Sequence, residues 1–193
     1  MNSVYLIYEN EISISNGYTF KEEFSLLRRL TPIQKVSVEI ISVLKLNNKK
    51  IYESCFKNEE IQIYFATKYG EIKSVIKTST FILKNELPVS PVSFQNSVHN
   101  CGVGIISIFH KLNMPHVVIC CSKDPFMKAY ELAYAKVKNA ISDVVCILFS
   151  EESANLEDNN ASSKMIIIGN DKFINKNKIN YVRKINCELS NDK

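Results

Sequence analysis

Several features that define membrane, zinc-binding and nucleotide-binding proteins are missing from this sequence of 193 residues. No apolar run approaches the roughly 18 residues of a membrane-spanning helix. The six cysteines contain no Cys-x-x-Cys pair, and the three histidines are not spaced with them as ligand pairs, so we expect no metal site. There is neither a Walker loop nor a Gly-x-Gly-x-x-Gly turn after a strand, and we therefore expect no nucleotide or other cofactor.

Other signals of function are also scarce. The formal net charge of +4 is spread along the chain, and no element carries the basic stripe interleaved with aromatic residues that nucleic-acid binding requires. No Gly-x-Ser-x-Gly elbow is present, and no pair of carboxylates stands out. The first residues, MNSVYLIYENE, lack the basic start of a secretory signal, so we expect a cytoplasmic protein whose buried cysteines act as small apolar side chains.

What is present is an alternation of strand-like and helix-like segments. Apolar periodicity predicts strands over 4–8, 61–66, 116–121, 143–150, 165–168 and 181–189, and helices over 20–30, 32–46, 71–84, 101–112 and 125–140. The runs HVVICC and DVVCILFS are continuously apolar, as in parallel strands that are covered on both faces. We expect one α/β domain over residues 1–193, with a mixed sheet of about five strands and helices on its faces.

Two helices and one loop carry further detail. Thr31, Pro32 and Gln34 form a capping-box sequence that starts the helix over 32–46. The Asn- and Ser-rich residues 151–163 are expected to form a solvated loop. The helix over 71–84 is expected to turn five apolar side chains inward, namely Ile72, Val75, Ile76, Ile82 and Leu83.

The chain is organised around residues 88–112, which read PVSPVSFQNSVHNCGVGIISIFHKL. We expect an extended piece over 88–94, a polar turn over 95–100, and then a helix whose apolar side chains surround most of its circumference. Such a helix belongs in the protein interior, because surface helices keep one polar stripe. Gly102 and Gly104 in its first turn indicate close packing of the backbone. Several acyl-transfer folds present a nucleophile on a buried helix that is entered through a sharp turn.

The same stretch resembles a known family through Ser-Pro at 90–91, Phe94 and Ser-Val-His-Asn at 97–100, which precede a Gly-containing apolar helix. These residues are similar to the β-ketoacyl-synthase-like N-terminal domain, and more narrowly to the short chain-length-factor subunits encoded with aryl-polyene and related fatty-acid-like pathways. Segments 26–40 and 65–72 are similar to the family's Arg-Arg helix and to its strand-end segment. The resemblance implies half of a thiolase-like fold with a buried central helix.

The resemblance also implies a function. Such a subunit forms a heterodimer with a full-length β-ketoacyl synthase subunit and works on chains that an acyl carrier protein holds. The synthase supplies the catalytic Cys and both His, while this chain shapes the pocket that measures the acyl chain. The alternative for His99 and Asn100 is that they serve only the turn itself. The candidate pocket or interface residues are Ser97, His99, Asn100, Gly102, Gly104 and Phe109.

Condensing synthases carry a nucleophilic Cys at the turn before the buried helix, and aligning that turn places the Cys at His99 or Val98. Cys101 lies two or three residues further on, and a shift of two residues rotates a helical side chain by about 200°. We therefore expect Cys101 to be a core cysteine and the chain to have no catalytic residue of its own. Two alternatives stay open: a minimal thiolase-like acyltransferase that uses Cys101, and a module that binds an acyl carrier protein through Lys128, Lys136 and Lys138.

Overall fold

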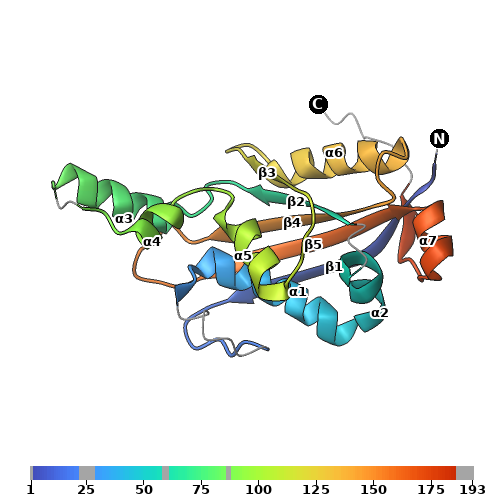
Figure 1. Cartoon of the computed structure of the whole chain (residues 1–193), viewed down its shortest axis with the longest axis horizontal. Coiled ribbons are helices and arrows are strands. Elements are labelled where there is room, and N and C mark those ends of the chain that lie inside the picture. Colours follow the sequence, from blue (N-terminus) through green and yellow to red (C-terminus); the bar gives the residue numbers. More distant parts are fainter. Residues whose placement is uncertain (1, 22–28, 58–60, 86–87, 186–193) are drawn as a thin grey trace.

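A computed structural model describes residues 2–21, 29–57, 61–85 and 88–185 of the chain. Its centre is a six-stranded mixed sheet with the order β3-β2-β4-β5-β1-β6 (Figure 1). The α/β class with a mixed sheet is thereby confirmed, with six strands in place of about five. The strands are β1 Val4–Ile14, β2 Gln62–Thr67, β3 His116–Cys120, β4 Val144–Glu152, β5 Ala161–Asn170 and β6 Arg183–Ile185.

The sheet is parallel in one half and antiparallel in the other. β2 runs parallel to both β3 and β4, with Ile63 opposite His116 on one side and Cys146 on the other. β5 runs antiparallel to β4 and β1, and β6 runs antiparallel to β1. It follows that β1, β2, β3 and β4 point the same way, so their carboxyl ends lie at one edge of the sheet.

Helices cover both faces of the sheet. Alternate side chains of β2 show the two layers: Ile63 and Phe65 join the core on the side of α1 and α5, whereas Tyr64 and Ala66 pack on the side of α6. This period of two is what a strand covered on both faces requires. The helices are α1 Pro32–Asn47, α2 Lys49–Tyr52, α3 Ile72–Leu83, α4 Pro91–Gln95, α5 Cys101–His110, α6 Pro125–Lys138 and α7 Asp171–Asn177, with a π-helical segment over Glu53–Lys57 after α2.

The capping box predicted at the start of α1 is present. The Thr31 hydroxyl accepts a hydrogen bond from the Gln34 amide at 3.3 Å, and the Gln34 side-chain oxygen accepts one from the Thr31 amide at 3.3 Å. Pro32 occupies the first helical turn, where its missing N–H leaves no bond unmade. α1 then packs against β5, β4 and β1 and against α5, which fixes α5 on that face of the sheet.

Three strands, β1, β4 and β5, are longer than the sequence predicted. The strand expected over 4–8 continues to Ile14, whose side chain packs on Ala161 beside α1. The loop expected over 151–163 is correspondingly short, because β4 and β5 form a hairpin that pairs Glu152 with Ala161. The serines in these strands are cross-strand neighbours rather than loop residues.

The C-terminal part contains a helix that the sequence pattern did not predict. α7 lies between the strands expected over 165–168 and 181–189, where no helix was predicted, and the Asn170 side chain caps it by accepting a hydrogen bond from the Phe173 amide at 3.0 Å. The last strand is only three residues long where it is described. Residues 22–28 of the helix expected over 20–30, and residues 186–189 of the last expected strand, lie outside the described part of the chain.

The segment over 88–94, which was expected to be extended, contains the helix α4. Pro91 starts this helix, and the Phe94 amide donates a hydrogen bond to the Ser90 carbonyl at 3.0 Å. The prediction of an extended piece is wrong because proline is favoured at the first position of a helix as well as in extended chain.

α3 packs on α4, and together they form an arm that extends beyond the end of the sheet (Figure 1). The Thr78 hydroxyl of α3 donates a hydrogen bond to the Ser93 carbonyl of α4 at 3.3 Å. The inward orientation predicted for five apolar residues of α3 is wrong for Ile82 and Leu83, which are exposed. The other three, Ile72, Val75 and Ile76, are only half-buried, because the sheet does not reach beneath this helix.

β3 and α5 are less buried than their sequences indicated. β3 is parallel to β2 as predicted, but it forms the edge of the sheet, and its side chains are exposed or half-buried rather than covered on both faces. In α5, Val103 and Ile106 are buried in the core, whereas Ile108 is 60% exposed. The predicted central helix is therefore interior on one side and open on the other.

The two glycines of α5 have different surroundings. A Cβ added to Gly102 would lie 2.8 Å from Cζ of Phe65, so the predicted close packing is confirmed there and involves a ring of β2. A Cβ added to Gly104 would meet nothing within 4 Å, so the same prediction is wrong for Gly104. Gly102 thus lets α5 approach the sheet, and Gly104 has no such role.

Candidate functional site

The candidate site lies at the edge of the sheet where the parallel strands end. Ligands of open α/β sheets bind beyond the carboxyl ends of such strands. In this chain β2 ends at Thr67 and leads through Gly70 and Glu71 into α3, while β4 ends at Glu152. The polar turn over 95–100 reaches this edge through His99.

His99 and Gly70 join the turn to the end of β2. Gly70 has a φ of +62°, and a Cβ at this position would lie 2.3 Å from Nδ1 of His99. Glycine is therefore needed both for the backbone conformation and for the space that the imidazole occupies. The two residues come from the two separate segments that carry the family resemblance, so the fold brings these segments into contact.

The other predicted residues have local roles. The Ser97 hydroxyl donates a hydrogen bond to the Phe94 carbonyl at 2.7 Å. Asn100 is the N-cap residue of α5, but its side chain makes no capping hydrogen bond. Phe109 packs against the core, with its ring edge-on to that of His110 at 5.1 Å. His99 is thus at the strand edge, whereas Phe109 lies about two helical turns along α5.

Cys101 is buried among polar side chains. Its Sγ accepts a hydrogen bond from Nε2 of Gln34 at 3.2 Å and lies 3.6 Å from Oδ1 of Asn96. Burial, together with the charge of Glu71, raises the pKa of the Cys101 thiol to about 11. A thiol with this pKa stays protonated near neutral pH, whereas the attacking species in thioester chemistry is the thiolate.

Two buried carboxyl groups, Glu71 and Glu152, lie at the same edge, although the sequence showed no carboxylate pair. Oε2 of Glu71 accepts a hydrogen bond from the Thr31 hydroxyl at 2.5 Å, and Oε1 of Glu152 accepts one from the Lys73 amide at 3.1 Å. Burial raises the pKa of Glu71 to about 8, with a further contribution from the Glu152 charge, and burial also raises the pKa of Glu152. Because Glu71 follows β2 and Glu152 ends β4, no spacing in the sequence could have revealed them.

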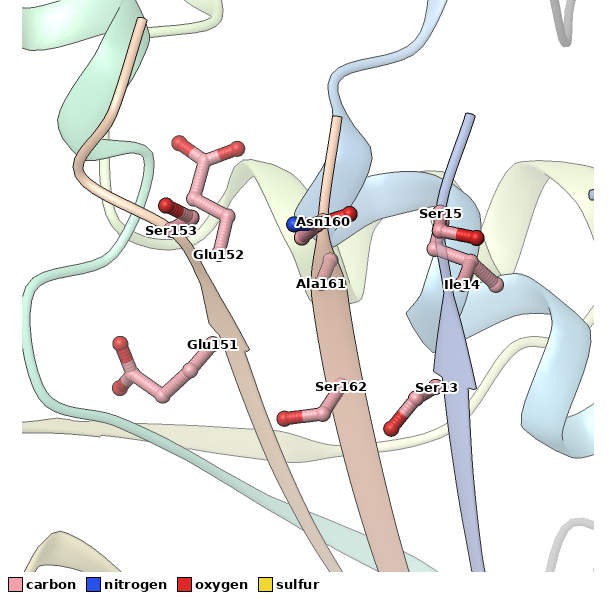
Figure 2. Close-up of a pocket in the computed structure, with 9 residues that line it drawn as sticks. All are labelled: Ser13, Ile14, Ser15, Glu151, Glu152, Ser153, Asn160, Ala161 and Ser162. Atoms are coloured by element: carbon pink, nitrogen blue, oxygen red, sulfur yellow. The ribbon is translucent and has the colours of Figure 1, made fainter. Parts of the chain in front are cut away.

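A pocket of about 430 Å³ opens beside Glu152, lined by the ends of β1 and β4 and the start of β5 (Figure 2). Ser13, Ser162 and Glu151 are cross-strand neighbours that lie in one row, and the Glu152 carboxyl group points away from this row (Figure 2). Burial raises the pKa of Glu151 to about 7, although the Thr67 hydroxyl donates a hydrogen bond to it at 3.0 Å. The lining therefore offers hydroxyl groups and a carboxyl group that titrates near neutral pH.

The connection between β3 and α6 ends in a residue whose φ is positive. Asp124 has a φ of +43° and caps α6, because its Oδ1 accepts a hydrogen bond from the Met127 amide at 3.1 Å. The predicted start of this helix is confirmed. α5, in contrast, follows the helix α4 and a turn rather than a strand. The strand-to-helix connection before α6 thus presents a carboxylate engaged with its own helix.

The three lysines considered for binding a carrier protein differ in their surroundings. Nζ of Lys136 donates a hydrogen bond to Oε1 of Gln62 at 3.2 Å and lies 5.7 Å from the centre of the Tyr64 ring. Lys128 is exposed, and Lys138 is half-buried. They therefore do not form one exposed basic cluster.

Within the described residues, no group of three or more His, Cys, Asp or Glu side chains is placed to hold a metal ion. The cysteines at 55, 101, 120, 121 and 146 are free thiols. No helix in the described ranges combines the length and the apolar character that crossing a membrane requires.

Solved structures share this fold at low sequence identity. A ketosynthase in complex with its chain length factor from Xenorhabdus doucetiae aligns with a TM-score of 0.61 and 15% identity over 85% of this chain. A β-ketoacyl synthase from Burkholderia phymatum STM815 aligns with a TM-score of 0.71 and 8% identity over 94% of this chain. The ishigamide ketosynthase/chain length factor aligns with a TM-score of 0.67 and 12% identity over 81% of this chain. The chain spans 78%, 62% and 49% of those three chains, in that order. These alignments establish a thiolase-like fold, as predicted.

The sequence itself assigns the family. The model of the β-ketoacyl synthase N-terminal domain matches residues 26–158, a range that includes α1, α5 and both strand ends of the candidate site. The chain belongs to this family, which confirms the resemblance drawn from its residues. No curated protein matches the chain in sequence.

Proposed function

We propose that this chain is a non-catalytic, chain-length-factor-like subunit that pairs with a full-length β-ketoacyl synthase and shapes its acyl pocket. Family membership supports the proposal, as does the likeness to ketosynthase and chain length factor complexes. In the proposed heterodimer the partner supplies the nucleophilic Cys and the two His of the condensation. The substrates are acyl or polyenoyl chains on an acyl carrier protein, as in fatty-acid-like or aryl-polyene biosynthesis.

The observation that carries the proposal is a set of uncovered apolar side chains on consecutive elements. Leu83 of α3 is 83% exposed, Phe94 of α4 is 62% exposed, and Ile108 of α5 is 60% exposed. β3 follows α5 in the chain and has one unpaired edge among the described strands. Exposed apolar surface and open strand edges of this kind mark contacts with other proteins. We therefore assign the arm, the open side of α5 and β3 to the interface.

The chemistry of the candidate site supports a non-catalytic role. The Cys101 thiol has its pKa raised to about 11, so it is not a thiolate near neutral pH. Asp124, at the strand-to-helix turn, is a carboxylate that caps α6. Neither group is prepared to attack a thioester, which needs a thiolate or an equally activated nucleophile.

In this role the chain selects acyl chains of a given length by the depth of the pocket that it shapes. Residues 95–100, including His99, connect the arm to α5 and therefore lie between the two proposed interface elements. Each methylene that the pocket accepts or refuses changes the binding free energy by about 1 to 3 kcal/mol. This is enough to fix the length of the product without any catalytic group from this chain.

The test is co-expression with a candidate synthase and its carrier protein. We expect the chain to co-purify with the synthase and the product length to change when the chain is omitted. Substituting Phe94→Asp together with Ile108→Asp is expected to abolish co-purification, because two charges would be buried in the interface. Leu132→Asp is the matched control, since Leu132 is 52% exposed on α6, outside the assigned surface. The proposal would be refuted if the double variant co-purified as well as the native chain and if omitting the chain left the product length unchanged.

A further inference from the structure

The buried carboxyl groups of Glu71 and Glu152 leave hydrogen-bonding capacity unused. Glu71 is 1% exposed and Glu152 is 6% exposed. Oε1 of Glu71 and Oε2 of Glu152 are both buried without a hydrogen-bond partner. Buried polar atoms are normally satisfied, so two orphaned oxygens at one edge require a common explanation.

The hydrogen bonds already present decide where a proton on Glu71 would lie. The Thr31 hydroxyl accepts from the Gln34 amide and donates its single hydrogen to Oε2 of Glu71. With Oε2 already accepting from Thr31, a proton on Oε1 is the arrangement that gives the unpartnered Oε1 a hydrogen to donate. This O–H group would be a hydrogen-bond donor, and Oε2 of Glu152 is a buried acceptor that has no donor.

The charges around the pair favour retention of a proton. Glu151 adds a third carboxyl group from β4, and Cys101 faces Glu71 from α5 as a protonated thiol. Burial raises the pKa of Glu152 and Lys73 of α3 acts to lower it, but Lys73 also forms an ion pair with Asp158 at 3.1 Å. Lys77 of the same helix is exposed. Like charges that share a buried site disfavour joint ionisation.

We propose that Glu71 and Glu152 hold one proton between them near neutral pH, and that this proton fastens the α3–α4 arm to the edge of the sheet. Glu71 is the N-cap residue of α3, and Lys73 in its first turn donates its amide to Glu152. Two hydrogen bonds between the start of α3 and the body therefore involve this pair, and the ion pair of Lys73 with Asp158 is a further attachment. α3 otherwise packs mainly on α4, so loss of the proton places two like charges at its attachment point and releases the arm.

The arm carries Leu83 and Phe94, which are exposed apolar side chains. Its release would change how this surface is presented to any protein that covers it. The protonated pair operates in the isolated chain, so it can be tested whether or not the partner is a synthase.

Hydrogen–deuterium exchange tests the link between the proton and the arm. After correction for the intrinsic exchange rate, we expect the protection of α3 amides to fall about tenfold for each pH unit above the pKa of Glu71, with α6 unchanged. Glu71→Gln keeps an acceptor for Thr31 and a donor for Glu152, so its α3 should stay protected at high pH. Glu151→Gln is the matched control and should retain the pH dependence of the native chain. Equal pH dependence in Glu71→Gln and the native chain would overturn the proposal.

Infrared spectroscopy provides a second measurement that needs no folded variant. The native chain near neutral pH should show the carbonyl band of a protonated, buried carboxyl group, and this band should disappear as the pH is raised above the pKa of Glu71. Absence of the band near neutral pH would overturn the proposal even if Glu71→Gln failed to fold.

Discussion

Gly102 and Gly104 lie two residues apart in α5 but differ in what their Cα atoms face. Gly102→Ala is expected to lower the free energy of unfolding by about 1 to 3 kcal/mol, because its methyl group would press on the Phe65 ring. Gly104→Ala is the matched control and should raise it by up to about 1 kcal/mol, since alanine favours the helix and has room. Urea unfolding measures the free energy of unfolding of both variants. Equal changes in Gly102→Ala and Gly104→Ala would contradict the close packing of Gly102 on Phe65.

Cys101 allows a direct test of the alternative in which the chain is an acyltransferase. Because the pKa of its buried thiol is raised to about 11, we expect a thiol-reactive acyl probe to label it more slowly than Cys121, which is partly exposed. Labelling is read by mass spectrometry of peptides from the native chain near neutral pH. Labelling of Cys101 ahead of every other cysteine would instead favour the acyltransferase.

Glu71 also gives the fold a pH dependence whose sign follows from its raised pKa. The pKa is raised from 4.5 to about 8, so the folded chain holds this proton more tightly than the unfolded chain. The resulting stabilisation is complete below the unfolded pKa and is lost as the pH rises through the folded value. We expect the free energy of unfolding to fall between about pH 4.5 and about pH 8, and Glu71→Gln to flatten this slope in urea unfolding series. A slope that Glu71→Gln leaves unchanged would assign the pH dependence to other groups.

At the scale of elements, the start of α1 links local and long-range structure. Thr31 caps α1 and also donates to Glu71, so Thr31→Ala removes the cap and leaves an unpaired oxygen. Losing the cap costs about 1 to 2 kcal/mol of unfolding free energy, and the orphaned carboxyl oxygen adds to this. Thr31→Ser keeps the hydroxyl and should remain close to the native chain. Thermal unfolding followed by circular dichroism measures the stability of both variants. Equal losses of stability in Thr31→Ala and Thr31→Ser would show that the hydroxyl does not stabilise the fold.

Elements with strong local signals could be predicted from the sequence, and those set by tertiary contacts could not. The helix after Thr31 follows from its capping box, and the central strands follow from their apolar runs. α4 was missed because Pro91 suits both extended chain and a helix start. The orientation of α3 was missed because its periodicity is helical but no sheet lies beneath it. Periodicity identifies an apolar face and does not say which protein covers it.

The candidate site was predictable only where its residues are close in sequence. The turn over 95–100 and the strand-end segment were each recognised from the family resemblance, but the contact of His99 with Gly70, which lies 29 residues away in the chain, was not predicted. Glu71 and Glu152 come together only through the order of strands in the sheet, which the sequence did not supply. The raised pKa of each carboxyl group likewise depends on burial that only the fold creates.

For the whole molecule, the uncovered apolar residues predict the behaviour of the chain without its partner. We expect the isolated chain to self-associate as its concentration rises, because Phe94 and Ile108 stay in contact with water in the monomer. The double variant Phe94→Asp/Ile108→Asp should remain monomeric in sedimentation velocity experiments, while Leu132→Asp should behave like the native chain. If the double variant associates as strongly as the native chain, the surface that drives association does not include Phe94 and Ile108.

The contact between His99 and Gly70 also constrains how related chains can diverge. Any side chain at position 70 would collide with the imidazole and would be strained at a φ of +62°. Evolution can therefore enlarge position 70 only in a lineage that has already shortened position 99 and rebuilt the turn. The two positions should consequently covary across relatives, although they are distant in the chain and belong to different motifs.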